Sequence, residues 1–98
     1  MAPYELMYVV RPELDDDGVQ HEIDRVNQLI ESNGGRVKKV TPWGKRRLAY
    51  TVKDLHEGHY VVAEFDLEST RVVEVERVLK ISDSVVRHLL VRQDEGKK

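Results

Sequence analysis

The chain begins with an alternating pattern that predicts a β-strand over residues 4–10, YELMYVV. The segment is rich in β-branched and aromatic residues, and Arg11-Pro12 ends it because proline cannot donate to a strand ladder. The two sets that alternation separates are expected on opposite sides of a sheet. One consists of Tyr4, Leu6, Tyr8 and Val10, and the other of Glu5, Met7 and Val9.

Helical spacing follows this strand. Four apolar residues recur at intervals of four, three and four, which places them on one stripe of a helix. The acidic run 15–17 supplies N-cap candidates, Asp17 and Gln20 have capping-box spacing, and Asn33-Gly34-Gly35 ends the helix. The stripe consists of Val19, Ile23, Val26 and Ile30.

A second helical pattern lies closer to the C-terminus. Ser69 or Thr70 can cap this helix, and residues 82–84, SDS, end it. Its stripe consists of Val72, Val75 and Leu79, with Val78 beside them.

Three further segments are expected to be strands. Residues 36–52 form one long strand with a bulge or bend at Pro42-Trp43-Gly44, because proline cannot donate to a ladder and glycine relaxes the backbone. Residues 54–59 are expected to form a turn. Residues 60–67, YVVAEFDL, show the clearest alternation in the chain, and residues 85–92, VVRHLLVR, form the last strand.

The resulting order of elements is β-α-β-β-α-β. With right-handed crossovers this order gives a ferredoxin-like split βαβ unit, an α+β fold with a four-stranded antiparallel sheet and two helices on one face. Topology places the long strand 36–52 at a sheet edge. Because two helices cover only one face, the face that carries Met7, Val9, Tyr60 and Val62 is expected to stay open to solvent or to a partner.

Length and composition agree with one domain that needs no covalent cross-link. The chain has 98 residues, no cysteine and no apolar run long enough for a membrane helix. Its start lacks the basic residues and the cleavage site of a signal peptide, so we expect a cytosolic protein. We expect a single domain over residues 1–93 and a short, charged, flexible tail over residues 94–98.

The distribution of charge is more informative than its sum. The net charge is −2, but residues 34–47, GGRVKKVTPWGKRR, hold six of the 16 lysines and arginines and no acid. The rest of the chain has ten cations against 18 acids and would repel a polyanion. A polyanion could therefore approach along one basic stripe, which consists of Arg36, Lys38, Lys39, Lys45, Arg46 and Arg47.

Two interpretations of the basic stripe stay open from composition alone. Cations on an edge strand discourage aggregation. They can also contact successive phosphates, and arginine adds bidentate geometry. The strand 60–67 lacks the aromatic run with which RNA-recognition domains stack bases, so a nucleic acid would be contacted through its backbone and shape. Trp43 could stack on a base, but an apolar anchor at the strand bend fits it better.

No pattern in the sequence predicts an enzyme or a metal centre. The serines lie at helix ends or turns, where capping explains them. His56 and His59 have the spacing of a two-ligand metal pair, but zinc takes three or four ligands, so we expect a turn with a half-packed His59. His88 is expected to be a structural residue of the last strand.

The stretch GGRVKKVTPWGKRRLAY resembles the bacterial ribosomal protein six family of the small subunit. The segments YELMYVVRPEL, KDLHEGHYVVAEFDL and LKISDSVVRHLLVR are similar to the same family at matching spacing, so the resemblance covers residues 3–92. It implies the ferredoxin-like fold and a structural role without catalysis, cofactor or small-molecule substrate. It also implies binding to the central domain of small-subunit ribosomal RNA as a heterodimer with small-subunit ribosomal protein eighteen, in the cytoplasmic ribosome.

The resemblance extends to individual residues. The family's G-x-R-R-L-A-Y segment maps onto residues 44–50, which implies a core role for Leu48, a packing role for Tyr50 and a polar role for the two arginines. No RNA contact is carried over to the N-terminus, where Ala2 and Pro3 replace the arginine of many relatives. Contacts with a partner protein are expected from Trp43, Tyr60, Val62 and Met7. RNA contacts are expected from Arg36, Lys38, Lys39, Lys45, Arg46, Arg47, Arg87 and Arg92.

Two other classes of function stay open. One is a protein-only module that dimerises through its open face or its edge and has no role with nucleic acid. The other is a small hydrolase of the acylphosphatase type, which shares this topology. That reaction needs an arginine cradle for phosphate with a paired asparagine, whereas Asn27 and Asn33 lie in or at the end of the first helix.

Overall fold

The computed structural model describes residues 1–52 and 55–93 and has the element order that the sequence predicts. The expected tail, residues 94–98, lies outside the described residues. The elements are β1 (Ala2–Val10), α1 (Asp16–Ser32), β2 (Arg36–Val52), β3 (Leu55–Leu67), a 3-10 turn (Ser69–Arg71), α2 (Val72–Ile81) and β4 (Val85–Arg92).

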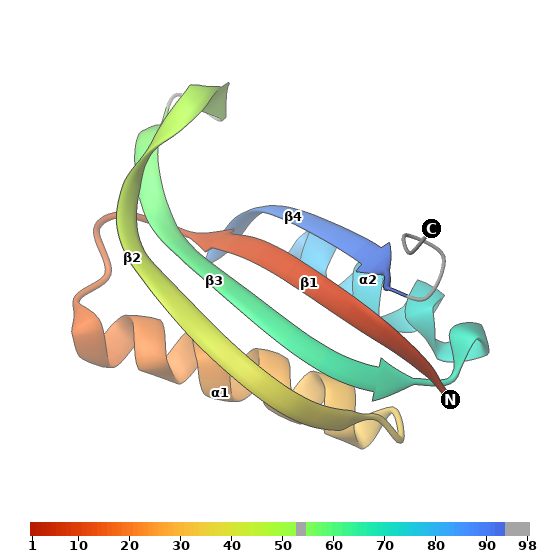
Figure 1. The fold of residues 1–98 in the computed structure, drawn as a ribbon. Helices are drawn as coiled ribbons and strands as arrows, with labels where there is room; N and C mark the ends of the chain where they lie inside the picture. Colours follow the sequence, from red (N-terminus) through yellow and green to blue (C-terminus); the bar gives the residue numbers. More distant parts are fainter. Residues whose placement is uncertain (53–54, 94–98) are drawn as a thin grey trace.

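The four strands form one antiparallel sheet in the order β2-β3-β1-β4. Both helices lie on one side of this sheet (Figure 1). The predicted ferredoxin-like α+β fold is therefore confirmed, and β2 lies at a sheet edge as expected. The other edge is β4.

The core fills the space between the sheet and the two helices. The rings of Tyr4 and Phe65 stack there, with centroids 5.9 Å apart. Full burial of one large apolar side chain contributes roughly 1.5–3 kcal/mol, so the two strand faces and the two helical stripes supply most of the stability. Buried members include Leu6, Tyr8 and Val10 of β1, Val61, Ala63 and Leu67 of β3, Ile23, Val26 and Ile30 of α1, and Val75 and Leu79 of α2.

Helix α1 begins at the acidic run, but only one of its residues caps the helix. The side chain of Asp15 accepts a hydrogen bond from the backbone N–H of Gly18 at 2.8 Å. The predicted capping box of Asp17 and Gln20 is wrong, because the Gln20 amide donates to Asp24 one turn later. At the other end Gly34 has a φ of 85°, which is the left-handed conformation that stops a helix.

The predicted caps of α2 are also wrong. Ser69 and Thr70 belong to a short 3-10 turn that leads directly into the helix, and the N-cap residue Arg71 makes no capping bond through its side chain. The first turn of α2 is thus continuous with the turn before it. Its end at Ser82 agrees with the prediction.

Strands β2 and β3 extend together beyond the rest of the sheet, and Figure 1 shows this extension bending up out of the plane of the sheet body. We call residues 45–52 and 55–59 the arm. The predicted turn over residues 54–59 is wrong from residue 55 onward, since that segment is strand. Residue 54 lies outside the described residues. The predicted bulge in β2 is confirmed, because the ladder shifts register between Pro42 and Gly44.

The arm closes part of the sheet face that the helices leave uncovered. Leu48 packs there against Val9 and Val86, with Tyr60 beside them. Val9 is only 1% exposed, so the prediction that it lies on an open face is wrong. A Cβ atom on Gly58 would collide with the Val9 side chain, which explains why glycine stands where the arm crosses the sheet.

Replacing Tyr8 with phenylalanine is expected to leave stability at neutral pH unchanged or to raise it by up to about 1 kcal/mol. The hydroxyl of Tyr8 is buried and has no hydrogen-bond partner among the described residues, so its removal costs no interaction. Burial, followed by the carboxylates of Glu22 and Asp24, raises the pKa of Tyr8 well above its usual value.

Urea unfolding across pH checks this expectation. Because the unfolded chain loses the tyrosine proton first, the wild type loses stability as the pH rises above about 10, whereas the variant lacks this contribution. A variant that is more than about 1 kcal/mol less stable at neutral pH would show that the hydroxyl is hydrogen-bonded after all.

Candidate nucleic-acid and protein interface

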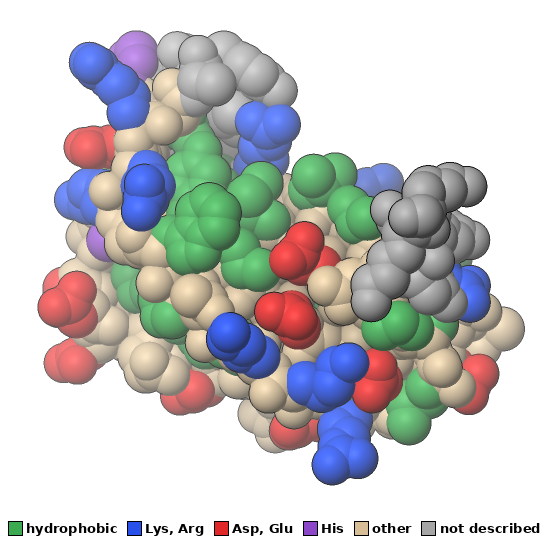
Figure 2. Space-filling model, in the orientation of Figure 1, with side chains coloured by type: hydrophobic (Ala, Val, Ile, Leu, Met, Phe, Trp, Pro, Cys, Tyr) green, Lys and Arg blue, Asp and Glu red, His purple; other side chains and the backbone are tan. Residues whose placement is uncertain are grey.

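The six cations of the basic stripe are all exposed along β2, but they do not form one continuous surface. Arg36, Lys38 and Lys39 lie at the start of the strand, and Lys45, Arg46 and Arg47 lie on the arm. Five residues of extended chain lie between the two groups and separate Lys39 from Lys45 by up to about 20 Å. Figure 2 shows cations near the arm at the upper left and again along the lower part of the molecule.

The first group is partly neutralised by the chain itself. Lys38 forms an ion pair with Asp66 at 3.3 Å, and Lys39 pairs in register with Glu64. Glu5 of β1 lies directly opposite Glu64 of β3. Carboxylates from two other strands therefore lie near this end of β2. Sequence reasoning missed them because they come from other strands. They weaken the local attraction for a polyanion.

The arm carries the cations that are available for an anionic partner. Within the described part of the chain, Lys45, Arg46 and Arg47 form no ion pair. Alternation along the strand separates them, so Arg46 points to the face that the helices leave free and its two neighbours point to the other face. An elongated anion that wraps the arm could contact all three, whereas a flat one could not.

Arg46 and Trp43 form a local unit at the bulge. The guanidinium carbon of Arg46 lies 5.6 Å from the centre of the Trp43 ring, and its Nε donates to the Trp43 carbonyl at 3.4 Å. Gly44, with a φ of 86°, makes the bulge that brings these two side chains together. A guanidinium held over an aromatic ring keeps its outer N–H groups free for an acceptor.

Arg87 and Arg92 lie apart from the basic stripe. Both belong to β4, the opposite edge of the sheet, and both are half-buried. Three strand spacings, about 14 Å, separate β4 from β2. In register, Arg87 faces Val9 and Arg92 faces Tyr4, so the two arginines come from different sides of the sheet. The eight predicted RNA contacts therefore do not share one surface, and their role stays a prediction.

The four residues predicted for a protein interface do share one face. Met7 lies opposite Val62 and Tyr60 opposite Gly44, next to the bulged Trp43. Trp43 is 49% exposed, whereas Val62 is 9% exposed and offers little surface. Leu89 lies opposite Met7 and is 52% exposed, a residue that sequence reasoning missed because β4 is apolar on both faces.

We call Met7, Trp43, Tyr60 and Leu89 the apolar face. Figure 2 shows hydrophobic side chains gathered below the arm, with carboxylates beside them. Exposed aromatic and aliphatic side chains that are rimmed by charge are typical of a protein interface. The interface role of these residues stays a prediction.

The histidines do not form a metal site. In a strand, residues three apart point to opposite faces, so His56 and His59 cannot chelate one ion together. The Nε2 of His59 donates to the Leu14 carbonyl at 3.0 Å, and His88 lies 3.5 Å from Glu76. Residues 1–52 and 55–93 contain no group of three or more possible metal ligands. In the same ranges, no helix is long and apolar enough to cross a membrane.

Fold and surfaces define a small ferredoxin-like protein that presents a basic arm and an apolar face for binding. The family described as ribosomal protein S6 matches residues 3–92. The chain belongs to this family, which confirms the resemblance seen in its sequence, and it is therefore a structural protein of the small ribosomal subunit and not an enzyme. Its location in the cytoplasmic ribosome follows from the family as well.

Similar proteins agree over almost the whole chain. Small ribosomal subunit protein bS6 of Carboxydothermus hydrogenoformans is 47% identical over 97% of this chain and 99% of its own. The protein of the same name from Desulfitobacterium hafniense is 44% identical over 97% of this chain and 100% of its own. The crystal structure of 30S ribosomal protein S6 from Thermotoga maritima has a TM-score of 0.90 at 26% identity and covers 96% of this chain and 89% of that one.

Replacing Arg46 with alanine is expected to expose the Trp43 ring without unfolding the protein. Trp43 is the single tryptophan of the chain, so its fluorescence reports this contact directly. We expect a red shift of the emission and stronger quenching by iodide, and a stability change of less than about 1 kcal/mol. Arg47→Ala is the matched control, since Arg47 lies on the other side of the strand. Equal quenching in the two variants would contradict the contact.

Proposed function

We propose that this chain binds the central domain of small-subunit ribosomal RNA through its basic arm, as a heterodimer with small-subunit ribosomal protein eighteen. The observation that carries the proposal is the cluster of Lys45, Arg46 and Arg47, exposed and without an ion pair among the described residues. Because the chain belongs to a ribosomal protein family, ribosomal RNA is the polyanion to which such a cluster is suited.

The charge of the whole chain explains why the arm is the point of contact. The net charge is −2, so most of the surface repels RNA. This repulsion orients the protein so that the arm approaches the RNA first. Cations on a strand contact phosphates and the sugar backbone, and they carry little information on base sequence. The RNA is therefore recognised by its shape, and the arm positions the protein along it.

Binding of RNA by the chain alone is weak. If all six cations of the basic stripe contacted phosphates, log K would fall with log salt with a slope of about −4 to −5. A heterodimer adds the contacts of the second protein to those of the arm, which raises the overall affinity without a new type of interaction. The apolar face is suited to this partner because Trp43 and Tyr60 supply large, partly exposed rings next to the arm.

Sedimentation of the tagged chain in a native lysate, with and without RNase, tests the ribosomal part of the proposal. We expect co-migration with small subunits that RNase abolishes. A protein that stays at the top of the gradient in both samples would instead indicate a protein-only module, with the cations serving to protect an edge strand.

Replacing Arg46 and Arg47 together with alanine is expected to weaken RNA binding by the heterodimer and to reduce the steepness of its salt dependence by about 2 in log K per log salt, one for each lost phosphate contact. Stability should hardly change, because both side chains are exposed. Arg71→Ala/Lys80→Ala is the matched control, since it removes two exposed cations next to or within α2. An unchanged salt slope in the arm variant would refute the role of the arm.

Replacing Trp43 with alanine is expected to lower the affinity for small-subunit ribosomal protein eighteen by about 2 kcal/mol, as for an aromatic anchor at the centre of an interface. Isothermal titration of the two purified proteins measures this change. Ile81→Ala is the control, because Ile81 is an even more exposed apolar residue, 68% accessible against 49% for Trp43, on the helix side of the molecule. A loss of the same size in both variants, or in neither, would place the partner elsewhere.

A further inference from the structure

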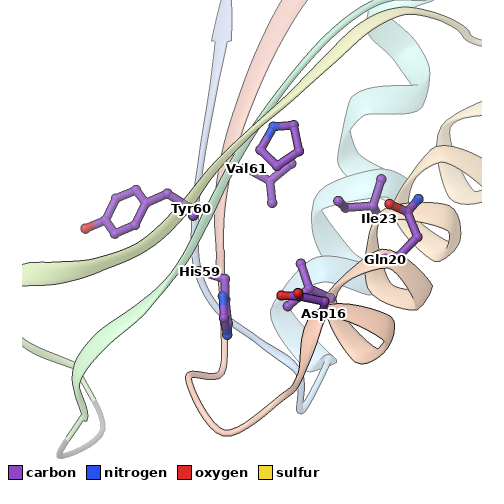
Figure 3. Close-up of a pocket in the computed structure, with 9 residues that line it drawn as sticks. Asp16, Gln20, Ile23, His59, Tyr60 and Val61 are labelled. Carbon is purple, nitrogen blue, oxygen red and sulfur yellow. The ribbon is translucent and has the colours of Figure 1, made fainter.

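A cavity of about 180 Å³ opens between the N-terminal half of α1 and the base of the arm. Figure 3 shows its residues on both sides of the gap, from the helix on one side and from β2 and β3 on the other. One water molecule takes roughly 30 Å³, so the cavity can hold the end of a long side chain or a molecule of similar size. The bulge at Gly44 bends β2 away from α1 and so forms one wall.

The floor and walls of this cavity are apolar. Val19 and Ile23 of α1 face Pro42 and Val61 of the sheet across it. These side chains would pack against an aliphatic stem of three or four carbon atoms. The backbone of Pro42 has no N–H, so this wall has one hydrogen-bond donor fewer.

The polar side chains Asp16 and Gln20 present acceptor oxygens at the rim, and in Figure 3 the Tyr60 ring points away from them. Asp16 offers a carboxylate for which no ion pair or hydrogen bond is present among the described residues. The Gln20 amide donates through Nε2 to Asp24 at 3.0 Å, which leaves its Oε1 as the atom available to a ligand. In Figure 3 this oxygen points toward the cavity and the nitrogen away from it.

His59 completes this set of acceptors. A backbone carbonyl can only accept, so the Nε2 that lies 3.0 Å from the Leu14 carbonyl carries the proton. In the neutral ring the other nitrogen, Nδ1, is then an acceptor. A ligand at the rim therefore meets a carboxylate and an amide oxygen, with the ring of His59 beside them.

The local charges agree with this chemistry. Asp15 and Asp17 flank Asp16 and offset the partial positive charge of the helix N-terminus. Lys45 is the cation closest in register, opposite His59, but it is not among the residues that line the cavity and it forms no ion pair with Asp16. The carboxylates at this end of α1 thus favour a positive charge at the rim, whereas Lys45, on the same side of β2, weakens that preference.

We propose that this cavity binds an alkylguanidinium or alkylammonium group, with the cationic head at Asp16 and Gln20 and the aliphatic stem between α1 and β2. Such a group can come from a free polyamine or from an arginine or lysine side chain of a neighbouring protein. The cavity lies on the helix side of the arm and is lined by none of its cations, so its occupancy can be measured without RNA.

Titration of the full, isotope-labelled chain with agmatine, followed by NMR, tests the proposal. We expect saturable shifts confined to the side chains of Gln20, Val19 and Val61, with a Kd on the order of 10 mM for so small a ligand. Butanol, which has the stem without the charge, should not saturate. Saturation by butanol with the same affinity would overturn the proposal.

Two variants that remove one negative charge each separate a specific site from the general field of the acidic run. Asp16→Asn is expected to weaken agmatine binding about fivefold, the effect of losing one partly exposed ion pair. Asp17→Asn, an equally exposed neighbour that does not line the cavity, should leave the affinity unchanged. Equal weakening by both variants would reduce the site to non-specific attraction and overturn the proposal.

Two further ligands distinguish the sources of the cation. Spermidine stands for a free polyamine, and N-acetylarginine methylamide stands for the side chain of a partner protein. Saturable shifts with only one of them assign the site to that source, and shifts with both support the shared chemistry. The absence of saturable shifts with agmatine and with both of these ligands would refute the site.

Discussion

The length of the β2–β3 ladder is the constraint on which the rest of the structure depends. The two strands stay paired well past the point where β1 and β4 end, and this extra pairing is the arm. A two-stranded ribbon without a covered face is marginal in water. The arm is held because it curls over the sheet and buries Leu48 against Val9 and Val86. Its stability and its position are therefore set by the same contact.

That contact explains why two glycines lie where they do. Gly44 supplies a positive φ at the bulge, where β2 must turn, and Gly58 permits the close approach of the arm to Val9. Without the bulge, Arg46 and Trp43, which are three residues apart, would not share one side of the strand. One distortion of a strand thus joins the start of the arm to an edge of the apolar face.

Periodicity was sufficient to predict the body of the fold. Alternation in residues 60–67 and helical spacing in residues 19–30 each report which side chains lose contact with water, and burial of those side chains stabilises the sheet and helices. The arm could not be predicted in this way. Residues 55–59 contain glycine and an acidic residue that are typical of a turn, and their strand conformation depends on pairing with residues 45–52 of β2. The predicted side-chain caps of α2 were wrong for a related reason. The 3-10 turn runs directly into the helix and makes a side-chain cap unnecessary.

The sequence predicted which segment carries the cations of the candidate interface, but it did not predict which residues lie together on one surface. The count of cations in residues 34–47 identified the basic stripe, because charge is a property of the segment itself. The ion pair of Lys38 with Asp66 and the exposure of Leu89 depend on strand order, which brings residues from distant parts of the chain together. These neighbours divide the basic stripe into a partly neutralised end and an arm without ion pairs among the described residues. In the proposed complex, such a surface would meet RNA at one projecting element, while the acidic remainder would keep the rest of the molecule away from phosphate. The sheet face next to the arm would then stay accessible to a second protein.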